Sequence, residues 1–117
     1  MNDLIKNTHM NTVTLDFTSG DMADISLFTG RKNGRKAKQY FNVKNGDRFI
    51  FIANDYQVIT SSYFLGLVGE ELTTLLKKLN NINDLLLRVD FTQLNEVSQN
   101  ECVRAIKRGL SENELLL

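Results

Sequence analysis

Apolar residues change their spacing along this chain, and the change predicts an alternation of strands and helices. Over residues 12–17 polar and apolar residues alternate, which predicts a half-buried strand. Over residues 48–53 apolar residues are nearly continuous, a pattern typical of a strand that is buried on both faces of a covered sheet. From residue 61 to 79 apolar residues recur at helical spacing, so we expect a long amphipathic helix there.

Three further segments extend this alternation. Residues 30–44 have the apolar spacing of a helix, and residues 85–91 resemble a second buried strand. Residues 94–110 again show helical spacing, and Gly109 is expected to end that helix because glycine favours the C-terminal position. The expected order is therefore strand, helix, strand, helix, strand, helix.

Such an order favours a layered α/β domain. We expect a small mixed sheet of about four strands covered by about three helices. A length of 117 residues suits one domain with one hydrophobic core, which we assign to residues 12–117. Residues 1–11 are expected to form a flexible tail. The apolar end at residues 115–117 is expected either to pack back on the domain or to form a homodimer contact.

Composition limits the class of protein. The formal net charge is zero, which argues against a general nucleic-acid binder because such proteins usually carry a basic excess. A single cysteine cannot form an internal disulfide, and residues 1–11 lack the apolar core of a signal peptide. No apolar run reaches the roughly 18 residues that a membrane-spanning helix needs. We therefore expect a cytoplasmic protein without a membrane partner.

One stretch, residues 50–72, carries a family resemblance. It reads IFIANDYQVITSSYFLGLVGEEL, that is, an apolar strand, an acidic turn and an I-T-S-S-aromatic motif that opens an amphipathic helix. Upstream, LFTGRKNGRKAKQYF is similar to the first helix of the same family. Over about residues 12–110 the chain resembles the STAS-like domain family, bacterial relatives of the anti-sigma-factor antagonist domains.

The resemblance implies a STAS-like fold and a non-enzymatic regulatory module in signalling. It implies docking of a protein partner, a histidine-kinase-like ATPase by family association, through the strand-to-helix junction at residues 55–63. The junction residues expected to bind the partner are Asp55, Thr60, Ser61, Ser62 and Tyr63.

In the antagonist domains, a serine at this junction is phosphorylated by the partner kinase. The resemblance places Ser61 at the phosphoacceptor position and makes Ser62 the second candidate. Here Thr60 stands where the antagonist domains have aspartate, and Tyr63 stands where they have glycine. Both serines also have a simpler interpretation, since serine is a preferred N-cap of a helix.

A dense group of basic residues supports a different function. It opens the helix expected at residues 30–44 and consists of Arg31, Lys32, Arg35, Lys36 and Lys38. It is either a solvated helix face or a contact for nucleic acid or an acidic surface. The alternative function is therefore a small phage or mobile-element accessory protein that contacts nucleic acid or a nucleoprotein through residues 31–38.

The sequence indicates no catalytic residue, cofactor or metal site. His9 is the only histidine and lies in the expected tail, and Cys102 is expected to be a small core residue. An enzyme that uses Asp55 with the hydroxyl groups of Ser61 and Ser62 is a third hypothesis, but no motif selects a reaction for it.

Overall fold

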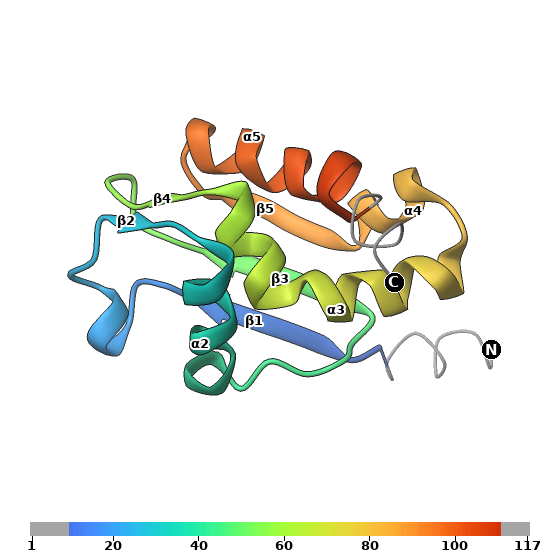
Figure 1. Ribbon diagram of the computed structural model, residues 1–117, viewed down its shortest axis with the longest axis horizontal. Helices are drawn as coiled ribbons and strands as arrows, with labels where there is room; N and C mark the ends of the chain where they lie inside the picture. Colours follow the sequence, from blue (N-terminus) through green and yellow to red (C-terminus); the bar gives the residue numbers. More distant parts are fainter. Residues whose placement is uncertain (1–9, 111–117) are drawn as a thin grey trace, which may run out of the picture.

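The computed structural model of the chain describes residues 10–110 (Figure 1). Most of the expected tail, with His9, and the expected contact at residues 115–117 lie outside the described residues. In chain order the elements are β1 (Thr12–Asp16), the 3₁₀ turn η1 (Gly20–Met22), β2 (Leu27–Phe28), α2 (Arg31–Phe41), β3 (Arg48–Ile52), β4 (Val58–Ile59), α3 (Ser61–Leu79), α4 (Ile82–Leu87), β5 (Val89–Gln93), α5 (Glu96–Arg104) and the π-helical turn η2 (Ala105–Gly109).

The strands form two small parallel sheets. One has the order β1-β3-β5, and the other pairs β2 with β4. The alternation of strands and helices is confirmed, but the expected single mixed sheet of about four strands is wrong. The physical reason is a repeated unit: a long strand, a short strand and a helix occur first as β1-β2-α2 and again as β3-β4-α3. Helical crossovers make successive long strands parallel, and the short strands pair in the same sense.

The helices cover only one face of the larger sheet. Buried side chains on that face include Val13, Leu15, Phe49 and Phe51, so the half-buried strand expected at residues 12–17 is confirmed. In Figure 1, α2 and α3 lie in front of the sheet, and α5 runs beside β5. The prediction that residues 48–53 are buried on both faces is wrong.

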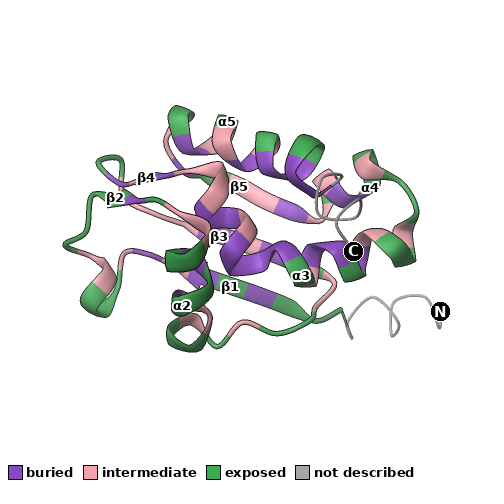
Figure 2. Cartoon of the chain, viewed as in Figure 1, coloured by how far each residue is buried: buried purple, intermediate pink, exposed green. Residues whose placement is uncertain are grey.

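The opposite face explains this difference. Ile50 and Ile52 alternate with the buried residues of β3, so their side chains point to this opposite face, and they are only half-buried. Thr12 and Thr14 on the neighbouring strand are exposed. Figure 2 shows this alternation of buried and exposed positions along β1. Both helical crossovers run in the same direction across the sheet, from β1 to β3 and from β3 to β5. Right-handed connections in one direction place their helices on the same side.

Helices α2 and α3 touch through their backbones at two glycines. A Cβ atom added to Gly34 would lie 2.2 Å from the carbonyl oxygen of Tyr63. A Cβ atom added to Gly66 would lie 1.9 Å from the carbonyl oxygen of Arg31. No side chain fits at either position, so glycine sets how closely the two helices approach.

An ion pair closes the same helix crossing further along. The ammonium group of Lys38 donates to both carboxylate oxygens of Glu71, at 2.7 and 2.9 Å, and to the carbonyl oxygen of Leu67 at 3.1 Å. Both charged side chains are largely shielded from solvent. Lys38 therefore belongs to the α2–α3 contact, and its assignment to a basic surface is corrected.

The strand expected at residues 85–91 is partly a helix. Asn81 caps α4, because its Oδ1 accepts hydrogen bonds from the amides of Asn83 and Asp84 at 2.8 and 3.2 Å. This cap stabilises a helical turn in an apolar run, and β5 begins only at Val89.

Within the described residues, no helix is long and apolar enough to cross a membrane.

The start of α3 and the end of the last helix also differ from expectation. Thr60 caps α3, accepting the amide of Tyr63 at 3.4 Å, so the expected cap at Ser61 or Ser62 is wrong by one or two residues. The final helix continues through Gly109 to Leu110. Gly109 fits there because a Cβ atom would lie 2.4 Å from the side chain of Leu65, so it is a packing residue and not a helix stop.

Replacing Gly66 with alanine tests the helix crossing. The added methyl group meets the backbone of α2, so we expect Gly66→Ala to lower the free energy of unfolding by about 1–3 kcal/mol. Gln39→Ala, at an exposed position of α2, is the control and should change it by less than about 0.5 kcal/mol. Urea denaturation measures both, and equal stability of the two variants would contradict the contact.

Capping of α3 gives a second prediction. We expect Thr60→Ala to lower the free energy of unfolding by about 1 kcal/mol, because it removes the cap of the longest helix described. Ser61→Ala should cost less than about 0.5 kcal/mol, because the backbone amide and not the side chain of Ser61 makes the bond seen there. Thermal denaturation measures both variants. If Ser61→Ala lowers the free energy of unfolding more than Thr60→Ala does, the serine and not Thr60 is the cap of α3.

Candidate functional site: the strand-to-helix junction

The junction between β4 and α3 lies beside the junction between β2 and α2. The amide of Thr60 donates to the carbonyl oxygen of Phe28 at 2.9 Å, and the amide of Gly30 donates to the hydroxyl oxygen of Ser62 at 3.2 Å. Two helix N-termini therefore meet at the carboxyl end of the parallel strands. In open α/β sheets this is the edge where ligands and partners usually bind.

A buried glutamine holds the loops around the junction. The side-chain amide of Gln57 donates to the carbonyl oxygens of Phe17, Met22 and Ile25 at 2.8, 2.9 and 3.1 Å. Its Oε1 accepts the amide of Asn54 at 2.7 Å. The residue is fully buried. Sequence reasoning missed Gln57, whose only signal is a polar residue directly before a short apolar strand.

The turn before β4 is held by hydrogen bonds from Asn95, the N-cap residue of α5, and it carries two exposed side chains. Asn95 donates to the carbonyl oxygens of Asp55 and Gln57 at 2.8 and 2.9 Å. The side chain of Asp55, one of the residues predicted to bind a partner, is exposed, and Tyr56 beside it is also exposed. The hydroxyl of Tyr56 donates to the carbonyl oxygen of Ala23, which anchors the aromatic ring on the surface. The turn therefore presents an acidic and an aromatic side chain in fixed positions.

Ser61 borders a hollow of about 400 Å³ between α3 and the end of α5. The exposed residues Arg104 and Arg108 line the same hollow. The amide of Ser61 donates to Oε1 of Glu101 at 2.8 Å, and the other carboxylate oxygen of Glu101 lies 3.7 Å from Arg104. A carboxylate thus already occupies the N-terminus of α3, where the helix favours negative charge.

The two serines differ in how far they are engaged. Ser62 Oγ accepts the amide of Gly30 and lies 3.2 Å from the hydroxyl oxygen of Thr60. Among residues 10–110, the Ser61 hydroxyl has no hydrogen-bond partner. Ser61 is therefore the more available of the two candidate phosphoacceptors.

Tyr63, the last of the predicted partner-binding residues, is buried in the core. Only 4% of it is exposed, and its ring packs against Phe28 with centroids 5.4 Å apart. Burial raises the pKa of Tyr63 to about 12. Its side chain lies on the α2 side of α3 and lines a separate pocket, so it is not part of the Ser61 hollow.

The predicted basic group divides between surface and interior. Lys32, Arg35 and Lys36 are exposed on α2, and Arg31 is half-buried where α2 meets α3. With Arg104 and Arg108 on α5 and η2, basic residues flank the start of α3 on both sides. The arginines of the hollow were not predicted as site residues, because only the fold brings them to Ser61.

Nucleophilic and metal chemistry find little support in the described part of the chain. Cys102 is buried as expected for a core residue, and burial raises the pKa of its thiol to about 12. The thiol is therefore protonated at neutral pH and is a poor nucleophile. Within residues 10–110 no three His, Cys, Asp or Glu side chains are placed to hold a metal ion.

Comparison of the chain with protein-family models, with curated proteins and with solved structures gives no match.

Proposed function

We propose that this protein is a non-enzymatic regulatory module that docks a protein partner through the junction at residues 55–63. The observation that carries the proposal is the position of Ser61. Its hydroxyl group is unpaired among residues 10–110 and lies at the start of α3, in a hollow lined by Arg104 and Arg108. The proposed docking segment also includes the exposed side chains of Asp55 and Tyr56, on a hydrogen-bonded turn.

The resemblance to the STAS-like domain family supplies the partner class. We propose a STAS-like, cytoplasmic protein whose partner is a histidine-kinase-like ATPase. A rigid turn favours such docking, because little conformational entropy is lost when a preformed surface binds. The bonds from Gln57 and Asn95 hold the turn in this way before any partner arrives.

Phosphorylation of Ser61 would switch this surface. A phosphate adds a charge of about −1.5 to −2 and three acceptor oxygens. It would compete with the Glu101 carboxylate for the amide of Ser61 and for Arg104, which now binds that carboxylate weakly at 3.7 Å. The hollow at Ser61 would then gain negative charge, and a partner that fits the unmodified hollow would meet repulsion and a desolvation cost.

Binding of nucleic acid through residues 31–38 is the second candidate. The exposure of Lys32, Arg35 and Lys36 favours it. Lys38 weakens it, because its charge is already neutralised by Glu71 inside the helix contact. The pull-down experiment described next separates nucleic-acid binding from docking of a protein partner.

Affinity pull-down from the native host, followed by intact-mass analysis, tests the proposed function. We expect recovery of a histidine-kinase-like ATPase, and an added phosphate that maps to Ser61 and is absent from the Ser61→Ala variant. Ser61→Glu should lower recovery of that ATPase by about tenfold, because it adds negative charge to the docking surface. Thr74→Glu adds the same charge at an exposed site on the second half of α3 and should leave recovery unchanged.

Two results would count against the proposal. If the Ser61→Glu and Asp55→Ala variants both recover as much ATPase as the unaltered chain does, the junction is not the docking surface. Recovery of nucleic acid, lost at raised salt and in the Lys32→Ala/Arg35→Ala/Lys36→Ala variant, would establish the second candidate instead.

A further inference from the structure

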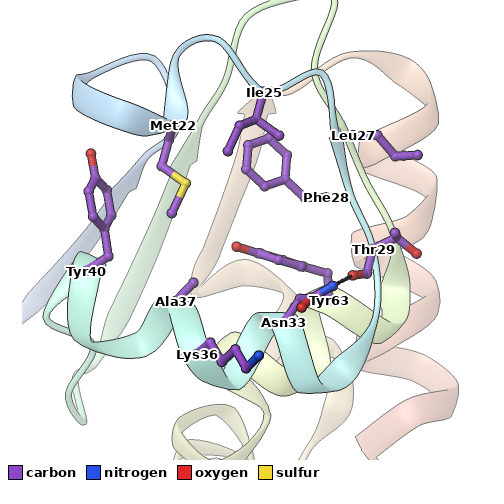
Figure 3. A pocket seen from close by; sticks show the side chains of 10 residues that line it. All are labelled: Met22, Ile25, Leu27, Phe28, Thr29, Asn33, Lys36, Ala37, Tyr40 and Tyr63. Atoms are coloured by element: carbon purple, nitrogen blue, oxygen red, sulfur yellow. Dashed lines mark hydrogen bonds between the residues drawn. The ribbon is translucent and has the colours of Figure 1, made fainter.

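A second hollow lies on the other side of α3 from the Ser61 hollow. It has a volume of about 340 Å³ and opens between α2 and the segment that joins η1 to β2 (Figure 3). Its walls are mostly apolar and include Met22, Ile25, Phe28 and Ala37. This volume is at the small end of the range for ligand pockets, and fits one ring with a short chain.

The hydroxyl group of Tyr63 turns this apolar hollow into a specific one. Figure 3 shows the Tyr63 ring at the base of the pocket with its hydroxyl group directed into the space between Met22 and Ala37. The residue as a whole is only 4% exposed, and its hydroxyl makes no hydrogen bond within residues 10–110. Because no side-chain nitrogen or oxygen atom in that range is both buried and unpaired, the hydroxyl oxygen is accessible from the hollow. A ligand that accepts its hydrogen bond there would gain a directed contact in an otherwise apolar site.

The charge at the pocket favours an acceptor that is negative. Lys36, on the α2 wall, is the one charged side chain among the residues that line the pocket. A tyrosine hydroxyl is protonated at neutral pH and can act as a donor there, and burial raises the pKa of Tyr63 further, to about 12. Apolar walls, the donor at Tyr63 and the cation on the α2 wall together define the chemistry of the ligand.

We propose that this pocket binds a small amphipathic carboxylate, with its apolar ring or branched chain between α2 and the η1–β2 segment and its head group as the acceptor for Tyr63. The positive charge of Lys36 favours the carboxylate over a neutral head group. The two sites meet only at Tyr63, whose buried side chain faces the pocket and not the Ser61 hollow, and neither proposal depends on the other.

Titration of the full chain with 4-phenylbutyrate tests the proposal, with 4-phenylbutanol and butyrate as comparison probes. We expect saturable binding of 4-phenylbutyrate by calorimetry, with a Kd of about 1 mM or tighter. The alcohol lacks the charge and butyrate lacks the ring, so each should bind about tenfold more weakly. Amide chemical-shift changes should be confined to residues 22–29, 33–40 and 63.

Three variants assign the roles. Tyr63→Phe removes only the hydroxyl oxygen and should weaken binding about five- to tenfold without lowering the melting temperature, because that hydroxyl makes no bond within residues 10–110. Lys36→Gln should weaken 4-phenylbutyrate about threefold and leave the alcohol unchanged. Lys77→Gln, an exposed lysine at the end of α3, is the control and should bind as the unaltered chain does.

The proposal is overturned by any of three results: no saturable binding of 4-phenylbutyrate, equal binding of the acid and the alcohol, or equal binding by the Tyr63→Phe variant. Because the titration uses the purified chain alone, its failure leaves the partner-docking proposal standing.

Discussion

The backbone contact between α2 and α3 determines how the strand-to-helix junction and the pocket at Tyr63 are arranged. Gly34 and Gly66 let the two helices meet without side chains between them, and the Lys38–Glu71 ion pair closes the crossing at its other end. The contact fixes the two helix N-termini side by side, with the amide of Gly30 bonded to Ser62. A wider separation would move the basic end of α2 away from Ser61 and would open the pocket above Tyr63.

The repeated unit of long strand, short strand and helix accounts for much of the remaining architecture. Strands β2 and β4 have two residues each, which is too short for stability by themselves. Gln57 offsets this weakness by binding three carbonyl groups of the segment between β1 and β2. A fully bonded polar residue in the interior also selects one loop geometry, since any other arrangement leaves buried polar groups unpaired.

The sequence predicts the elements whose burial follows a regular period, and fails where a polar side chain or a distant contact decides. Alternation in β1 and helical spacing in α3 both predict the correct element. The prediction of a strand from residue 85 onward is wrong, because the Asn81 side chain caps a helical turn that apolar spacing alone does not reveal. The prediction that β3 is buried on both faces is wrong, because only the handedness and direction of the crossovers show that the helices share one face of the sheet.

The candidate site was predictable in part for the same reason. Ser61 and Asp55 lie where a strand-to-helix junction places them, and a local motif is enough to find such a junction. The hollow beside Ser61 depends on Arg104 and Arg108, more than 40 residues away in the chain. The pocket at Tyr63 depends on the η1–β2 segment in the same way, and an aromatic residue after two serines gives no sign of it.

Hydrogen exchange of the complex recovered from the host, compared with the free chain, is the most direct test of the central claim that a partner docks at the junction. We expect slower exchange of amides in residues 53–63 and in the facing turn of α5 when the partner is bound. Slower exchange confined to the strands of the open sheet face, or to α4, with residues 53–63 unchanged, would contradict it.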